Sequence, residues 1–288
     1  MKKRQPVLNI FFIILCAIII VPFVLIVSVS LSNEADVLKN GYSFFPENFD
    51  LTAYRYVFLN PTSIINAYKV TIIYSVAATF LGVLLMAMFA YPLSQKPLPG
   101  RITISFLLYF TMLFSGGLVP TYILTANYLH LSNTIWVYIV TGLISPWYVF
   151  MMRTFFSDIP DAIIESALID GANDFTIFAR FIIPLSKPII ATIALFLFLG
   201  KWNDWNTALL YITDDKLVSL QYLLQKIMMN IQLIQNSDFA ASVASSKAVP
   251  AETVRMAMVV IVAGPALMVF PFFQKYFVKG LTVGSVKG

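Results

Sequence analysis

Long apolar stretches alternate with shorter polar segments along the chain. A helix needs about 20 predominantly apolar residues to cross the hydrocarbon core of a bilayer. Six stretches reach that length, namely residues 7–31, 66–93, 102–126, 133–155, 188–212 and 251–273. The pattern therefore predicts an all-α integral membrane protein with six transmembrane helices, arranged as one polytopic domain over residues 1–288.

Two of the predicted spans contain residues that break helices. Pro22 predicts a kink in the first span, because proline removes a backbone hydrogen bond. Gly116, Gly117 and Pro120 interrupt the third span near its outer end, which makes it the weakest of the six. These three residues fit either a gate hinge or a plain helix break.

The composition supports a lipid environment. Hydrophobic residues make up 59% of the chain and charged residues 11%, with a mean hydropathy of +0.82. A soluble domain carries about 25% charged residues, so one water-facing core would not bury this much apolar surface. The net charge of +5 is not gathered in a basic stripe, so nucleic acid is not an expected partner.

The basic residues between the spans predict an orientation, because cytoplasmic loops carry an excess of Lys and Arg. With the N-terminus inside, eleven lie in cytoplasmic segments: Lys2, Lys3, Arg4, Lys96, Arg101, Arg153, Arg180, Lys187, Lys275, Lys279 and Lys287. Five lie in outer segments: Lys39, Arg55, Lys216, Lys226 and Lys247. This excess places both termini and residues 156–187 in the cytoplasm, in a multi-pass protein of the cell (plasma or inner) membrane.

Motifs for independent catalysis are missing from the sequence. It contains no Walker sequence, GxGxxG fingerprint, HExxH or CxxC pair. Cys16 and His130 are the only residues of their types, so the sequence predicts neither a disulfide nor a histidine metal site. We therefore expect a chain that is not an enzyme and that holds no metal or cofactor of its own.

The cytoplasmic segment 156–187 predicts two short helices outside the membrane. Acids around Pro160 favour a helix start, and Gly171 favours a helix end in the left-handed conformation. A second helix is expected at about 174–182, stopping at Pro184. The first helix would present an apolar ridge flanked by carboxylates, with Ile164, Leu168 and Ala172 at spacings of four and Asp161 and Glu165 beside them.

The acids of this segment predict a protein partner. An amphipathic loop resting on lipid headgroups is the plainer interpretation. Anionic lipid would repel the four carboxylates of the segment, Asp161, Glu165, Asp170 and Asp174. We therefore expect the segment to bind a soluble protein.

The same segment resembles the EAA loop of permease subunits of ABC importers. Glu165, Ala167, Gly171 and Pro184 stand at the matching places, with Ser166, Phe181 and Ile183 as mild departures. Asp170-Gly171-Ala172, with Phe178 and Pro188 downstream, is typical of the carbohydrate-uptake branch. Residues 272–288 are similar to the tail of the maltose-type second permease, in the oligosaccharide and polysaccharide (lipoprotein-linked) branch.

This resemblance implies the fold and the partners. The fold would be that of a type I ABC importer permease, with a cytoplasmic coupling helix docked on an ATPase subunit. The residues implied in coupling are Glu165, Ser166, Ala167, Asp170, Gly171, Ala172, Phe178 and Pro184. In the tail, 274–288, the residues implied to reach between the ATPase subunits are Lys279, Gly280, Gly284 and Gly288. The partners would be a second homologous permease, two ATPase subunits that bind ATP and Mg, and an extracytoplasmic sugar-binding protein.

A polar belt interrupts the fifth predicted span. It consists of Lys201, Trp202, Asn203, Asp204, Trp205 and Asn206. On a continuous helix Lys201 would lie about 20 Å from the inner end, where Asp204 three residues on would partly neutralise it. The belt fits the wall of a sugar pathway, since Trp rings and amides suit sugar rings and hydroxyls. An interfacial belt, or a contact with the partner permease, remains the alternative.

The resemblance thus implies a permease subunit that moves a sugar, of the oligosaccharide class, into the cytoplasm by ATP-driven alternating access. An ABC permease for a non-sugar solute is the first alternative. An ion-coupled secondary transporter is less favoured, because Asp204 is the one acid expected at mid-membrane. A membrane-embedded enzyme would need a catalytic constellation that the chain lacks.

Overall fold

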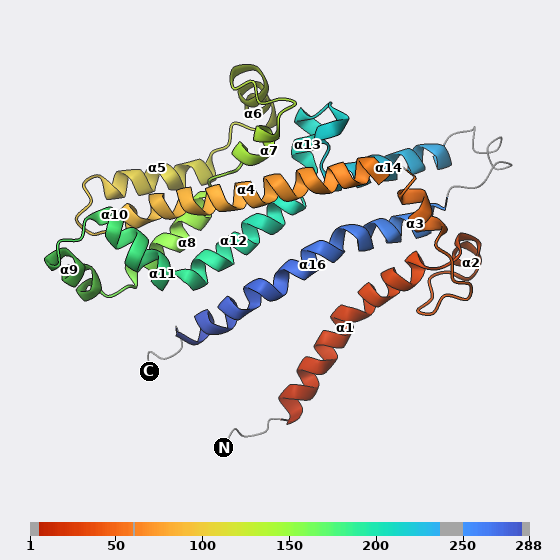
Figure 1. Ribbon diagram of the computed structural model, residues 1–288, viewed down its shortest axis with the longest axis horizontal. Coiled ribbons are helices and arrows are strands. Elements are labelled where there is room, and N and C mark those ends of the chain that lie inside the picture. Colours follow the sequence, from red (N-terminus) through yellow and green to blue (C-terminus); the bar gives the residue numbers. More distant parts are fainter. Residues whose placement is uncertain (1–5, 60, 237–249, 284–288) are drawn as a thin grey trace. The chain divides into compact units, whose positions relative to one another are not determined.

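The computed structural model describes residues 6–59, 61–236 and 250–283 (Figure 1). In these ranges the regular structure is helical, and the only β pairing is an isolated bridge between Ser32 and Phe49. The chain divides into two compact units. The first holds residues up to Ile65 together with Leu223–Pro265, and the second holds Asn66–Tyr222 and the chain from Ala266 onward.

Three helices are each long and apolar enough to cross a membrane. They are α1 (Pro6–Ser30), α4 (Pro61–Ser94) and the part of α16 (Ala251–Val283) that ends at Pro271. Two bent helix pairs pass the same test only when each pair is taken as one span. The all-helical membrane class predicted from the sequence is confirmed, whereas the number six and the single domain stay predictions.

The third predicted span is broken where its glycines lie. Helix α5 (Arg101–Leu113) is followed by α6 (Leu118–Ile123) and one π turn, η1 (Leu124–Tyr128). The two halves are bent by 111°. Gly117 has a φ of 87°, a conformation that other residues adopt only at a cost. The predicted interruption at the glycines is therefore confirmed.

The fourth predicted span, 133–155, is not one continuous helix, so that expectation is wrong. Helix α7 (Ile135–Val140) ends before Gly142, which has a φ of 65°. Helix α8 (Pro146–Ser157) begins with a proline in its first turn, where the missing N–H costs no intrahelical bond. Glycine and proline four residues apart thus divide an apolar stretch that looked continuous.

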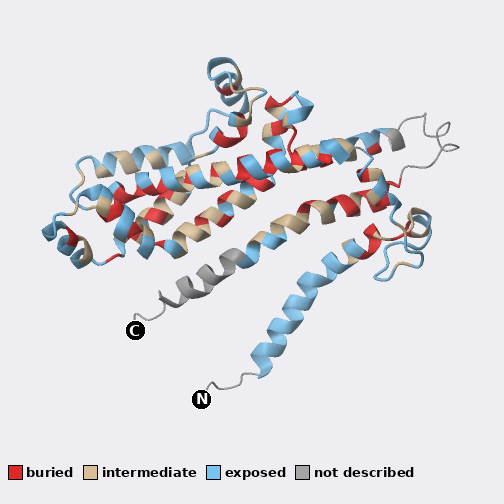
Figure 2. Ribbon diagram, viewed as in Figure 1, coloured by how far each residue is buried: buried red, intermediate tan, exposed pale blue. Residues whose placement is uncertain are grey.

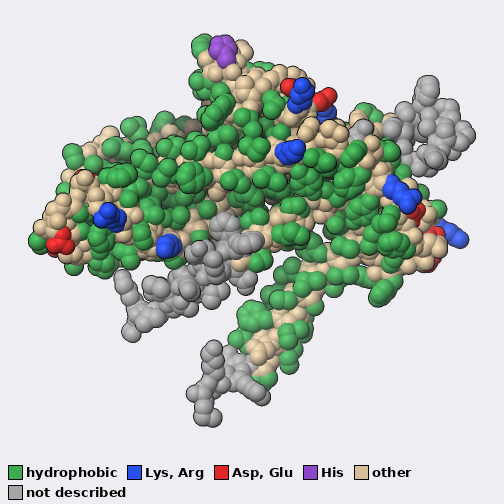
Figure 3. Space-filling view, in the orientation of Figure 1, with side chains coloured by type: hydrophobic (Ala, Val, Ile, Leu, Met, Phe, Trp, Pro, Cys, Tyr) green, Lys and Arg blue, Asp and Glu red, His purple; other side chains and the backbone are tan. Residues whose placement is uncertain are grey.

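The core of the second unit joins α4, α8, α9 (Asp161–Ile169), the π turn η2 (Phe178–Ile182) and α12 (Lys187–Trp202). Its fully buried side chains include Met86, Met152, Phe156, Ile182 and Ile193. Figure 2 shows stretches of buried residues in red along α4, α8 and α12. Figure 3 shows apolar side chains along the flanks of α4 and α5, and charged side chains at the end that carries α9 and α10 (Asp174–Ile177).

In the first unit, α2 (Glu34–Asn40) is tied to the start of α16. The Glu34 carboxylate accepts hydrogen bonds from the N–H groups of Glu252 and Thr253, each at 2.9 Å. An acid at this position also suits the positive end of the helix dipole. Tyr42 Oη donates to Glu252 Oε2 at 2.7 Å, and this bond raises the pKa of the Tyr42 phenol. Hydrogen bonds from Thr52 lower the pKa of Asp50 in the same segment between α1 and α4.

Gly82 marks a close approach of α4 to the rest of the second unit. A Cβ at this position would lie 2.7 Å from Leu197 Cδ2 and 2.8 Å from the carbonyl oxygen of Leu143. The leucine side chain can move, but the backbone carbonyl has little room to do so. A small residue is therefore required at this helix contact.

We predict that Gly82→Ala lowers the free energy of unfolding by about 1–3 kcal/mol, because the added methyl overpacks the contact. Equilibrium unfolding of the full chain in mixed micelles would measure the change. Gly200→Ala is the matched control, since nothing lies within 4 Å of a Cβ built there. Equal stability of the two variants would contradict the close approach.

Candidate functional site

Helix α9 is short, lies outside the apolar stretches of the sequence and has a well-defined C-terminal cap. It starts after Pro160 and ends at Ile169, and Asp161 lies in its first turn. Gly171 has a φ of 79°. The N–H of Gly171 donates to the carbonyl of Leu168 at 3.0 Å, and that of Ala172 to the carbonyl of Ala167 at 2.9 Å. This pair of bonds is a Schellman closure, so the predicted end at Gly171 is confirmed.

The second helix begins as predicted and runs further than predicted. Asn173 Oδ1 accepts from the N–H of Thr176 at 2.8 Å and caps α10. The chain then continues through η2 into α11 (Ile183–Leu185). Pro184 lies inside this last turn, so the expected stop at Pro184 is wrong. The π turn before it is the reason, because it shifts the backbone hydrogen bonds that a proline would otherwise break.

The faces of α9 differ from the expected ridge. Ala167 is buried, and Ile163 and Ile164 pack against the core of the second unit. The outward face instead carries Glu165 together with Ile169, four residues on and 86% exposed. The expected apolar ridge thus partly faces inward. The spacing of Glu165 and Ile169 was the signal that could have identified the outward face.

The remaining residues implied in coupling fall into two groups. Ser166 and Asp170 are exposed on α9 and its C-cap, and Pro184 is exposed in α11. Phe178 is buried against Tyr91, with ring centroids 5.5 Å apart, and Ala172 is half-buried. Buried members of the motif therefore hold α9 and α10 in place, and exposed members are available to a partner.

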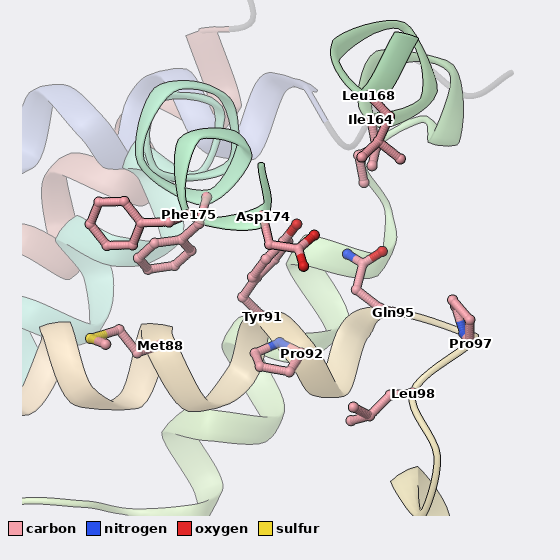
Figure 4. A pocket seen from close by; sticks show the side chains of 11 residues that line it. Met88, Tyr91, Pro92, Gln95, Pro97, Leu98, Ile164, Leu168, Asp174 and Phe175 are labelled. Atoms are coloured by element: carbon pink, nitrogen blue, oxygen red, sulfur yellow. The ribbon is translucent and has the colours of Figure 1, made fainter. Parts of the chain in front are cut away.

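A cavity of about 510 Å³ lies between α9, α10 and the end of α4 (Figure 4). Ile164 and Leu168 line it from α9, and Tyr91 and Phe175 line it from α4 and α10. The only polar side chains among its lining residues, apart from the Tyr91 hydroxyl, are Gln95 and Asp174. The cavity is thus an apolar recess at the base of the helix that we expected to bind a protein.

The polar belt does not lie on one continuous helix. Helix α12 ends at Trp202, and α13 (Asn206–Tyr211) begins after a break of three residues. Lys201 is only 6% exposed. Its ammonium donates to the carbonyl oxygens of Tyr138 at 2.7 Å and Thr141 at 2.5 Å. The direct partners of Lys201 are therefore the carbonyls at the broken end of α7.

Asp204 has a different role from the expected neutralising partner. Its carboxylate accepts from the N–H of Thr207 at 3.0 Å and from Thr207 Oγ1 at 2.6 Å, which gives one N–H in the first turn of α13 a partner. The charges of Lys201 and Asp204 attract each other. In the described part of the chain, however, no salt bridge joins them.

The other residues of the belt differ in exposure. Trp202 is buried and lies against Phe198, with ring centroids 5.8 Å apart. Asn203, Trp205 and Asn206 are exposed. A cavity of about 370 Å³ opens beside the belt, lined by residues that include Gly200, Lys201, Asp204 and Thr207. The belt therefore combines a buried cation with an exposed amide and indole edge.

Two tyrosines that the sequence analysis did not single out support the belt. Tyr74 and Tyr138 are fully buried and stack with ring centroids 4.3 Å apart and planes 8° from parallel. Tyr74 Oη donates to the carbonyl of Lys201 at 3.0 Å, and Tyr138 Oη donates to the carbonyl of Leu217 at 2.8 Å. A tyrosine within an apolar stretch was the sequence signal that could have identified them, because a buried tyrosine hydroxyl needs a hydrogen-bond partner.

Two of the four tail residues implied to reach the ATPase subunits lie among the described residues. They are Lys279 and Gly280 of α16, which remains helical to Val283. Gly284 and Gly288 lie outside the described residues. Among the described residues, no three His, Cys, Asp or Glu side chains form a group that could hold a metal ion.

Comparisons with known proteins define first a class and then a family. No protein-family model matches the chain. LplC of Bacillus subtilis is 38% identical over 273 residues, which cover 94% of this chain and 90% of LplC. The polygalacturonan/rhamnogalacturonan transport system permease protein YtcP of the same organism is 36% identical over 278 residues, which cover 96% of each chain.

A solved structure agrees with these relatives. It is a crystal structure of a bacterial ABC transporter involved in the import of the acidic polysaccharide alginate. The TM-score is 0.80 and the identity 28%, over 96% of this chain and 99% of that one. The class is thus a helical membrane permease. The chain belongs to the family of permease subunits of carbohydrate ABC transporters.

We predict that Lys201→Met lowers the free energy of unfolding by about 1–3 kcal/mol. The substitution keeps the length of the side chain but leaves the carbonyls of Tyr138 and Thr141 without their donor. Unfolding of the full chain in mixed micelles would measure the loss. The same substitution at the exposed Lys216 is the control and should have little effect. A Lys201 variant as stable as the control would contradict the structural role.

Proposed function

We propose that the chain is the transmembrane permease subunit of a binding-protein-dependent importer that moves an oligosaccharide into the cytoplasm. The observation that carries the proposal is the outward face of α9. It carries the carboxylate of Glu165 and, one turn further on, the exposed Ile169. The names of similar proteins support the ligand class. YtcP is named for polygalacturonan and rhamnogalacturonan, and AraQ of Bacillus subtilis, 26% identical, for arabinooligosaccharides.

In this proposal the energy comes from a partner, because no nucleotide-binding motif occurs in the sequence. Two ATPase subunits would bind and hydrolyse ATP with Mg. A cleft on one of them would take α9, with Glu165 facing a basic residue and Ile169 entering an apolar pocket. A charge-assisted contact beside an apolar anchor is a common composition of a tight interface.

The rigidity of α9 matters for the transfer of work. The Schellman closure fixes the C-terminal end of the helix. The buried Ala167 packs the helix against the core of the second unit. Movement of the ATPase would then displace the packed helices rather than deform a loop. Alternating access follows if that displacement opens the bundle first to one side and then to the other.

The assembly would also contain a second homologous permease and an extracytoplasmic sugar-binding protein. Both termini and α9 would lie in the cytoplasm, and α2 and α3 (Thr52–Val57) would lie outside. The tail residues Lys279, Gly280, Gly284 and Gly288 would reach the ATPase subunits. The basic residues between the spans support this orientation.

The polar belt would form part of the sugar pathway. Asn203, Trp205 and Asn206 are the exposed members that offer an indole face and amides to a sugar. Lys201 and Trp202 are buried, so they would hold the exposed members in position rather than contact the sugar. The belt thus divides into residues that would meet the sugar and residues that hold the wall.

We expect Glu165→Arg to weaken association with the ATPase subunit by roughly 10- to 100-fold, the scale of a lost charged hydrogen bond. Co-purification and stimulated ATP turnover of the reconstituted importer would measure this. The control is Glu47→Arg, which reverses an exposed carboxylate on the outer segment. Unchanged association and turnover in the Glu165 variant would refute the coupling assignment.

For the pathway, we expect Trp205→Ala to lower the initial rate of oligosaccharide uptake about two- to tenfold, because an aromatic contact is worth about 0.5–1.5 kcal/mol. Assembly with the ATPase should be unaffected. Uptake of labelled oligosaccharide into vesicles would test this, with Trp136→Ala on the exposed side of α7 as control. Full uptake by the Trp205 variant would remove this residue from the pathway.

A further inference from the structure

Arg101 and Arg153 lie on two helices that pack together, at the start of α5 and in the second half of α8. Arg153 Nη1 donates to Ser105 Oγ at 3.1 Å, and Ser105 lies one turn after Arg101 on α5. Arg101 Nε donates to the carbonyl of Leu93 at 2.8 Å. Ser105 Oγ donates in turn to the carbonyl of Arg101 at 2.7 Å, so one serine connects the two arginines. Each is thus held in place by a neutral acceptor and beside a like charge.

The pair has no carboxylate partner among the residues that the structure describes. Asp161 of α9 pairs with Lys96, at 3.0 Å between Nζ and Oδ2. Each of these two hydrogen bonds uses one of the five N–H donors of a guanidinium. Both side chains are half-buried, so their remaining donors are accessible. A site of this kind suits an anion with several oxygens, such as phosphate, which a guanidinium can bind through two parallel hydrogen bonds.

An apolar stripe beside the pair indicates that the phosphate belongs to a lipid. Ile102, Phe106, Tyr109 and Leu113 follow one another on α5 at spacings of four, three and four, and are 85%, 60%, 50% and 61% exposed. No residue of α5 is buried. A phosphate at the arginines would place an attached acyl chain along this stripe. A free phosphate would make no use of it.

We propose that Arg101, Arg153 and the stripe on α5 form a binding site for one anionic phospholipid. The Lys96–Asp161 contact places the chain just before Arg101 beside α9. The assignment to the cytoplasmic leaflet rests on the proposed function, which puts α9 in the cytoplasm. Anionic lipids and clustered basic residues attract each other at that surface. The bound lipid neutralises two like charges that the chain leaves uncompensated.

Lipid binding to the purified full chain tests the site directly. Native mass spectrometry would count phosphatidylglycerol and phosphatidylcholine retained on the chain during a titration of each lipid. We expect the wild type to retain phosphatidylglycerol preferentially. Arg101→Gln and Arg153→Gln should each lower that retention about tenfold, the scale of one lost charged hydrogen bond. Arg180→Gln, an exposed arginine on η2, is the matched control and should retain it fully.

Further arms separate the sources of phosphate and guard against misfolding. Inorganic phosphate at millimolar concentration should not displace the lipid, and displacement by it would overturn the lipid assignment. Arg153→Lys keeps the charge and should recover part of the retention if folding is intact. Equal retention by wild type and both glutamine variants would refute the site. Because the assay uses neither ATP nor sugar, its result is independent of the coupling and uptake tests.

Discussion

In the hydrocarbon of a membrane every backbone N–H and C=O needs a partner within the protein. Several helices of the second unit are broken, and side chains supply some of the missing partners there. The ammonium of Lys201 satisfies two carbonyls at the end of α7. Asn133 bonds to the backbone of Thr213 and Asp214, and Thr71 Oγ1 accepts from the N–H of Leu220 at 2.9 Å. Side chains from distant segments thus make the breaks tolerable.

The same constraint explains how the two regions that we propose to be functional are built. The belt exists where α12 stops, and its buried cation and stacked tyrosines complete the backbone bonds there. Helix α9 lies outside the apolar stretches and completes its own end through Gly171. The backbone at the belt is therefore completed by tertiary contacts, and the end of α9 by local ones. This difference suits a wall that must stay closed to lipid and a helix that must offer a free face.

Local signals predicted the α9 segment well and the belt less well. Pro160, Asn173 and Gly171 set the helix ends through nearest-neighbour geometry, so sequence spacing was sufficient. The faces of α9 were misjudged because burial of Ile164 depends on α4 and the core, not on α9 itself. At the belt, spacing suggested an ion pair between Lys201 and Asp204. The break after Trp202 gave each charge a nearer partner on another element.

The sequence by itself determined the solvent, the helical class and the family. Apolar length and charge content require lipid, and the loop around Glu165 and Gly171 resembles one family of permeases. Only the tertiary structure decided where the fourth and fifth predicted spans break and which side chains remain exposed. The physical reason is that hydropathy records the preference of each residue for lipid. It does not record which distant donor reaches a carbonyl when a glycine or proline opens the helix.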